Sequence, residues 1–136
     1  DLQPEYRRQR QMCIRDRTSK LENGTYSMYH QQYQMALKLF TDIIKEDPKW
    51  AEGWNKRATL LFIMGNYEKS LDDIEKVLDL EPRHFGALSG RAQIYLSYKQ
   101  YEKAIDDLRK AKSIYPLIKS GENIRLIEKI IKEQQI

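Results

Sequence analysis

Between residues 51 and 84, apolar side chains recur at intervals of three and four positions in two separate stretches. They are Trp54, Ala58 and Leu61 in the first stretch and Leu71, Ile74 and Leu78 in the second. Such spacing places the side chains of each stretch on one face of a helix. Gly65 separates the two stretches, and Pro82 disfavours the helical conformation at the residue before it. The pattern therefore predicts a helix, a turn and a second helix.

The same pattern recurs with a period of 34 residues. The residues in register include Pro48, Pro82 and Pro116; Tyr33, Tyr67 and Tyr101; and Gly24, Ala58 and Ala92. A single helical hairpin cannot bury its apolar stripes alone, so stacked copies must bury each other. We predict an all-α chain of three hairpins over 17–50, 51–84 and 85–118. A capping helix over 119–136 is expected to close the stack, with Ile124, Ile127 and Ile131 as its apolar stripe.

An arginine precedes an aspartate by sixteen residues at equivalent places in the second and third copies, as Arg57 with Asp73 and Arg91 with Asp107. The first copy lacks both charges at these places. We predict an Arg–Asp contact between the two helices of each hairpin; the alternative is that the arginines lie on a solvated face. An exposed pair of this kind contributes only about 0–1 kcal/mol to stability. In either case we interpret the pairs as structural contacts and not as catalytic groups.

Residues 1–17 differ from the rest of the chain. They carry five arginines, three acids and no apolar stripe, and the string MCIRDR resembles translated sequencing-adapter read-through. We therefore interpret 1–17 as an atypical basic N-terminal segment with the features of a sequencing artefact. Leaving out its five arginines and three acids lowers the net charge from +4 to +2, which weakens the case for nucleic-acid binding.

The composition argues against several classes of function. No apolar run approaches the ~20 residues of a membrane span. Cys13 is the only cysteine, which excludes an internal disulfide and a cysteine metal cluster. The six glycines form no phosphate-binding loop. His84 lies in the turn between the second and third copies, where packing against a neighbouring helix is favoured over a general-base role. We predict no enzymatic activity, no cofactor and no metal.

The repeat pattern resembles tetratricopeptide (TPR) repeats, including those of small bacterial TPR-containing proteins. The resemblance rests on the 34-residue period, the closing prolines, the spacing of Trp54, Ala58 and Leu61, and the pair Ala36 and Phe40. The resemblance covers about residues 17–118. The chain departs from the family pattern at Arg57 and Arg91, which replace a usual leucine. It also departs at Lys20, which stands where the second copy has Trp54. The resemblance implies a right-handed α-solenoid whose first helices line a concave groove, and it implies a protein-interaction module.

The groove residues follow from this resemblance and from the rotation of about 100° per helical residue, which gives each first helix a second face. The candidates are Leu21, Thr25, Met28, Asn55, Thr59, Phe62, Ser89, Gln93 and Leu96. None is charged, and the Asn55 and Gln93 amides can both donate and accept hydrogen bonds. We therefore expect an extended, largely uncharged peptide or a partner helix as occupant; the alternative is that these side chains only pack between helices. Some TPR domains hold an acidic C-terminus through basic residues, but among the matching places only Lys56 is basic.

Two other functions stay open at this stage. The first is nucleic-acid binding through Arg7, Arg8, Arg10, Arg15 and Arg17, which we disfavour. The second is that the chain is a fragment of a larger protein with a separate catalytic domain. We expect a monomer or a weak dimer. The compartment is undetermined: cytoplasmic, or periplasmic if the natural N-terminus carries an export signal.

Overall fold

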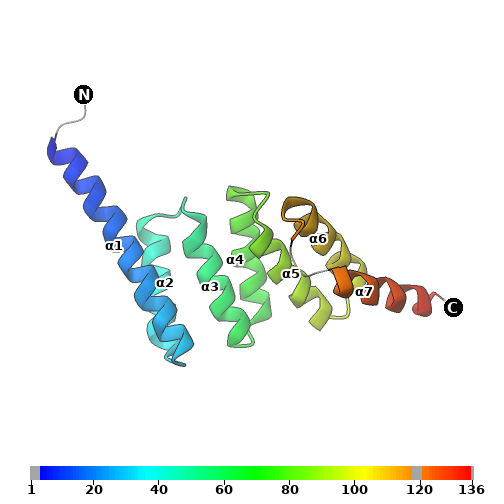
Figure 1. Ribbon diagram of the computed structural model, residues 1–136. Helices are drawn as coiled ribbons and strands as arrows, with labels where there is room; N and C mark the ends of the chain where they lie inside the picture. Colours follow the sequence, from blue (N-terminus) through cyan, green and yellow to red (C-terminus); the bar gives the residue numbers. More distant parts are fainter. Residues whose placement is uncertain (1–3, 118–120, 136) are drawn as a thin grey trace.

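The computed structural model describes residues 4–117 and 121–135, and its elements there are all α-helices. They are α1 (Pro4–Tyr29), α2 (Tyr33–Glu46), α3 (Ala51–Ile63), α4 (Tyr67–Leu80), α5 (Phe85–Ser97), α6 (Tyr101–Ile114) and α7 (Gly121–Gln134). Figure 1 shows them following one another in chain order, with the two termini at opposite ends. Helices α1–α2, α3–α4 and α5–α6 pack as hairpins, and α2–α3 and α4–α5 contacts stack the hairpins. The predicted all-α solenoid is confirmed.

The apolar core consists of three clusters, and each is completed by a helix from the next unit. Leu60 of α3 is fully buried with residues of α1 and α2. Ile94 of α5 is fully buried with residues of α3 and α4, and Ile127 of α7 lies in the cluster of α5 and α6. Leu60 and Ile94 are one 34-residue period apart. Stacking therefore works by inserting buried side chains of each unit into the core of the unit before it.

Small residues at one place in each hairpin match the size of the side chain that they face. A Cβ atom on Gly24 would lie 2.5 Å from Cε1 of Phe40, so only glycine leaves room for this ring. The second copy pairs Ala58 with Ile74 in one cluster, and the third copy pairs Ala92 with Leu108 in another. Glycine thus faces the large Phe40 ring, whereas alanine faces the smaller Ile74 and Leu108 side chains. This match lets the two helices of each hairpin pack closely.

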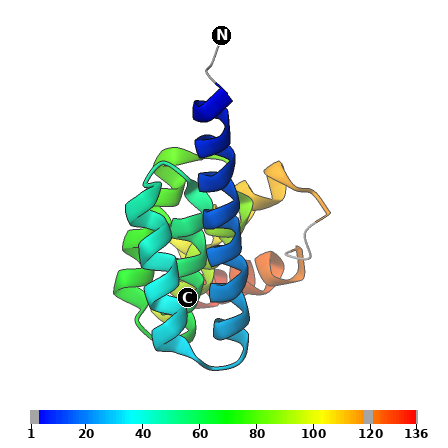
Figure 2. The ribbon, with the colours of Figure 1, turned by 90° about the vertical axis from the view of Figure 1, so that its left-hand side faces the viewer.

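Helix α1 extends well beyond its hairpin partner. Its first turns project past α2 in Figure 2, and the described side chains from Pro4 to Asp16 are exposed. Pro4 suits the first turn of a helix because it lacks only an N–H that would have no helical partner there. The absence of an apolar stripe in 1–17 agrees with this exposure, although the segment is helical from Pro4 onward.

The turns inside the three hairpins place one residue each in the left-handed region. Gly65 has φ of 81°, while Gln31 and Lys99, one period before and after it, have φ of 59° and 58°. Glycine adopts this conformation without steric cost, whereas other L-residues are strained there. The first and third turns therefore store strain that the second turn avoids.

We expect Gln31→Gly and Lys99→Gly each to raise the free energy of unfolding by about 1 kcal/mol, because glycine relieves the left-handed strain. The matched control is Gly65→Lys, whose Cβ would meet nothing within 4 Å, so its expected loss of stability comes from the backbone alone. Urea unfolding followed by circular dichroism measures all three. A loss of stability in both glycine variants would refute the assignment of strain to these turns.

None of the helices within the described ranges combines the length and the hydropathy that crossing a bilayer requires.

Candidate functional site

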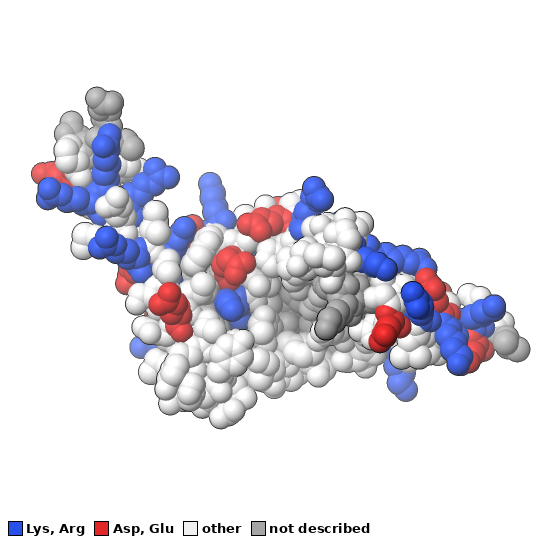
Figure 3. All heavy atoms as spheres, in the orientation of Figure 1, with Lys and Arg blue, Asp and Glu red and all other residues white. Residues whose placement is uncertain are grey.

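A pocket of about 230 Å³ lies between the first helices of the second and third hairpins, α3 and α5. Five of the predicted groove residues line it: Asn55, Thr59, Phe62, Ser89 and Gln93. Ser70 and Ile74 of α4 close its base, and none of the lining residues is charged. In Figure 3 the surface over α3 and α5 is hollowed, and the part of this face below the hollow carries few charged side chains.

The recess exists because α5 offers little side-chain volume on this side. Gly86 and Gly90 are four residues apart, and Ala87 and Ser89 lie beside them in the pocket wall. Residues four apart share one face of a helix, so the two glycines open a notch toward α3. A Cβ on Gly90 would touch only Cδ1 of Ile74, at 3.9 Å. The glycines were missed as pocket residues; their signal was two glycines about one turn apart within a single helix.

The polar groups of the pocket are few. The Thr59 hydroxyl donates to the Asn55 carbonyl at 3.0 Å, so this hydrogen is engaged within α3. The Ser89 hydroxyl is buried and has no hydrogen-bond partner within the described part of the chain. Gln93 is exposed at the rim, where its amide can both donate and accept. The lining thus combines apolar surface with neutral hydrogen-bonding groups and suits an uncharged polypeptide segment.

The other four predicted groove residues lie elsewhere. Met28 requires a correction: it is only 3% exposed and belongs to the core around Phe40, because its unbranched side chain fits among those residues. Leu21 packs against the same core, and Leu96 packs against the core of the third hairpin. The Thr25 hydroxyl donates to the Leu21 carbonyl at 2.7 Å. The pocket therefore brings together all three predicted residues of the second copy, two of the third and none of the first.

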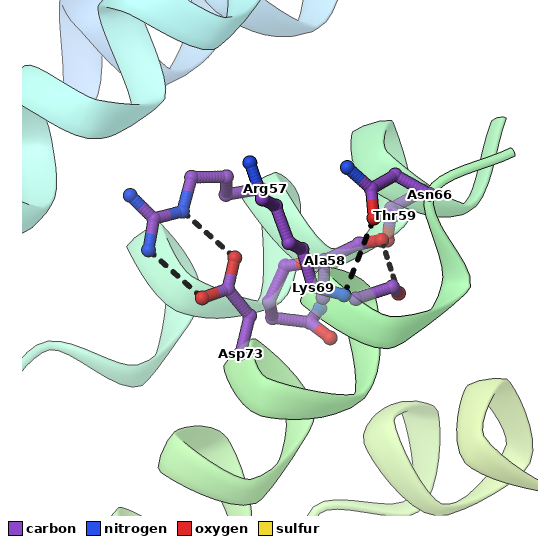
Figure 4. Close-up of polar contacts among 8 residues, drawn as sticks. Arg57, Ala58, Thr59, Asn66, Lys69 and Asp73 are labelled. Atoms are coloured by element: carbon purple, nitrogen blue, oxygen red, sulfur yellow. Dashed lines mark hydrogen bonds and ion pairs between the residues drawn. The ribbon is translucent and has the colours of Figure 1, made fainter. Parts of the chain in front are cut away.

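The predicted Arg–Asp contacts are confirmed in both hairpins. Arg57 donates from Nε and Nη2 to the two carboxylate oxygens of Asp73, at 2.7 and 2.8 Å (Figure 4). Arg91 makes the same two bonds to Asp107, both at 2.8 Å, and this carboxylate raises the pKa of the Arg91 guanidinium. Both aspartates are buried. Two parallel bonds fix the guanidinium plane, so these pairs orient the arginines as well as joining the helices.

His84 joins the second and third hairpins beside the pocket. The Ala87 N–H donates to Nδ1 of His84 at 3.0 Å, so the ring caps the N-terminus of α5. Its Nε2 lies 3.2 Å from Oε1 of Glu52 on α3. The hydrogen bond with Glu52 raises the pKa of His84 and lowers the pKa of Glu52. The predicted packing against a neighbouring helix is confirmed.

The basic residues of the N-terminal segment do not form one surface. Arg7, Arg8, Arg10 and Arg15 are exposed on the projecting turns of α1. Arg17 instead pairs with Asp47 and lies over the ring of Trp50, with its Cζ 4.3 Å from the ring centroid. One of the five arginines proposed for nucleic-acid binding is therefore engaged in holding α1 to the end of α2.

These features define a class of protein: an α-solenoid of helical hairpins with a hollow between consecutive first helices. Models of the tetratricopeptide repeat family match residues 51–84 and 86–116. The chain is a tetratricopeptide repeat protein.

Two relatives agree with this assignment. A TPR repeat-containing protein of Rhizobium etli is 60% identical over 53 residues, which are 39% of this chain and 26% of that protein. Hsp70-Hsp90 organizing protein 1 of Glycine max is 34% identical over 61 residues, which are 45% of this chain and 11% of that protein. The matched part thus spans about a quarter of the first relative and about a tenth of the second.

Two solved structures have the same fold. The first TPR of Spaghetti (RPAP3), bound to the HSP90 peptide SRMEEVD, superposes with a TM-score of 0.80 at 18% identity, over 87% of this chain and 94% of that chain. The Arabidopsis OM64 TPR domain superposes with a TM-score of 0.78 at 20% identity, over 90% of this chain and 98% of that chain. At these identities the likeness shows the fold alone.

Proposed function

We propose that the chain is a non-catalytic protein-interaction module that holds an extended, largely uncharged polypeptide segment between α3 and α5. Its units would be the hairpins 17–50, 51–84 and 85–118 with α7 as the cap. The proposal rests on one observation above all, the uncharged pocket formed by Asn55, Phe62 and the glycine notch of α5. A partner helix is the alternative occupant, but a pocket of about 230 Å³ suits single side chains of an extended segment better.

The relatives support protein binding in general, and the pocket supports a different chemistry of recognition from theirs. The RPAP3 domain is bound to SRMEEVD, a peptide with three acidic residues. A segment of that charge would gain little here, because no basic residue lines the pocket of this chain. Neutral amides and a hydroxyl can instead hydrogen-bond the backbone of an extended segment, while the apolar wall takes a side chain.

A displayed library of random twelve-residue peptides, selected on the whole chain, tests the proposal. We expect the selected peptides to be poor in charged residues at their common positions. Gln93→Glu should weaken their binding by about tenfold or more, because the new carboxylate would be desolvated in the complex. Calorimetric titration measures this change.

Gln34→Glu on the exposed surface of α2 is the matched control, since it adds the same charge away from the pocket. It should leave the affinity unchanged. Peptides that bind both variants as tightly as the unaltered chain would place their site elsewhere and would contradict the proposal. The same result would follow if the selected sequences were uniformly acidic.

A further inference from the structure

A second pocket, of about 460 Å³, opens on the other side of α3, where α2, α3 and α4 meet. Leu37, Trp54 and Leu61 supply its apolar part, and Arg57 and Lys69 border it. At about 100° per residue, Trp54, Arg57 and Leu61 point away from the face that carries Asn55 and Phe62. The two pockets are therefore separate surfaces of one helix.

The third hairpin has an aromatic side chain at the position equivalent to this pocket. Its residues at the positions of Arg57, Leu61 and Lys69 are Arg91, Tyr95 and Lys103. Both cations lie near the Tyr95 ring, whose centroid is 5.8 Å from Cζ of Arg91 and 5.7 Å from Nζ of Lys103. Cations at these distances are attracted to the face of an aromatic ring. The chain thus fills this place with its own tyrosine in one hairpin.

The second hairpin keeps both cations but has no aromatic residue at the position of Tyr95. Leu61 replaces the tyrosine and is buried, with only 6% of its surface exposed, so it does not reach out between Arg57 and Lys69. Asp73 holds the Arg57 guanidinium through two hydrogen bonds, and its Cζ lies 5.2 Å from the Trp54 ring centroid. The guanidinium is oriented in advance and needs little reordering to receive a second ring.

We propose that this pocket receives a tyrosine or phenylalanine side chain of a partner polypeptide, in the place that Tyr95 takes in the third hairpin. The ring lies between Arg57 and Lys69 with its edge on Leu37 and Trp54. The acidic rim residue Asp72 and the Thr41 hydroxyl, both in the pocket lining, are available to the flanking backbone. The site does not depend on the groove between α3 and α5.

Nuclear magnetic resonance of the ¹⁵N-labelled full chain tests the proposal with two capped peptides, Gly-Gly-Tyr-Gly-Gly and Gly-Gly-Leu-Gly-Gly. We expect the tyrosine peptide to shift the amide signals of Arg57, Leu61 and Lys69, and the leucine peptide to shift them far less. Lys69→Gln, on an exposed residue, should weaken tyrosine-peptide binding about two- to fivefold by removing one cation. Leu61→Tyr should abolish binding, because the chain then fills its own pocket.

Several outcomes would overturn the proposal. Equal shifts with both peptides would show that the ring is not recognised. Unchanged binding in Lys69→Gln would show that the cation takes no part, whether or not Leu61→Tyr folds. Shifts confined to Asn55 and Gln93 would place aromatic groups in the groove. Binding of p-cresol without binding of the tyrosine peptide would show a site for small aromatic molecules rather than for a polypeptide.

Discussion

Leu60→Ala is expected to lower the free energy of unfolding by about 2–5 kcal/mol, the usual range for removing a large side chain from a closed core. Leu60 is fully buried among residues of the first hairpin although it belongs to the second. The substitution therefore opens a cavity at the joint between two units. Urea unfolding gives the total loss, and hydrogen exchange should show that amides of α2 lose protection together with those of α3.

Tyr26→Ala is the matched control, because Tyr26 stands one period before Leu60 and has no hairpin in front of it within the described residues. It is 61% exposed and stacks on His30 with ring centroids 3.9 Å apart. We expect its loss to cost less than about 1 kcal/mol. Similar losses in Leu60→Ala and Tyr26→Ala would contradict the view that this position joins consecutive units.

Gly24→Ala is expected to destabilise the protein by about 1–3 kcal/mol, although alanine is the better helix former. The added Cβ would lie 2.5 Å from Cε1 of the fully buried Phe40 ring, and a packed ring cannot move aside. In a Phe40→Ile background the same substitution should instead be neutral or stabilising by up to about 1 kcal/mol. That combination reproduces Ala58 with Ile74 of the second hairpin.

The sign change is measured by a double-mutant cycle of the four proteins in urea. A Gly24→Ala effect of the same size and sign in both backgrounds would show that Phe40 is not the obstacle. The Phe40→Ile single variant gives the change in the free energy of unfolding that is due to the lost ring volume alone.

The repeating hairpins could be predicted because a 34-residue period and a three-and-four spacing each constrain the same residues. Ala58, Ile74 and Ile127 are buried as the stripes required. The Arg57–Asp73 contact could also be predicted, since a sixteen-residue spacing across a tight hairpin turn brings the two helices' side chains level. These features depend on helix periodicity, which a single sequence expresses directly.

The groove could be predicted only in part, because periodicity gives a direction and not the space around a side chain. Met28 points by position toward the groove, yet its flexible chain turns into the core beside Phe40. The recess of α5 depends on what Gly86 and Gly90 leave open, which becomes visible only when α3 is in place. The pocket beside Leu61 likewise required a comparison of packed hairpins, since its cause is a ring that the second hairpin lacks.

No apolar stripe in the sequence indicated that the first turns of α1 are helical. The described side chains from Pro4 to Asp16 are exposed, so no periodic apolar stripe was available to predict the helix. Arg17 joins this helix to the end of α2 through Asp47 and Trp50.

The salt dependence of binding distinguishes a largely uncharged polypeptide segment in the hollow between α3 and α5 from a charged one. A peptide selected on the chain would be titrated calorimetrically at about 0.05 M and at about 0.5 M sodium chloride, between which charge attraction is strongly screened. We expect dissociation constants within about twofold of each other at the two salt concentrations, and binding about tenfold weaker or more in Gln93→Glu. Weakening by about tenfold or more at the higher salt, with Gln93→Glu binding as before, would contradict the proposed function.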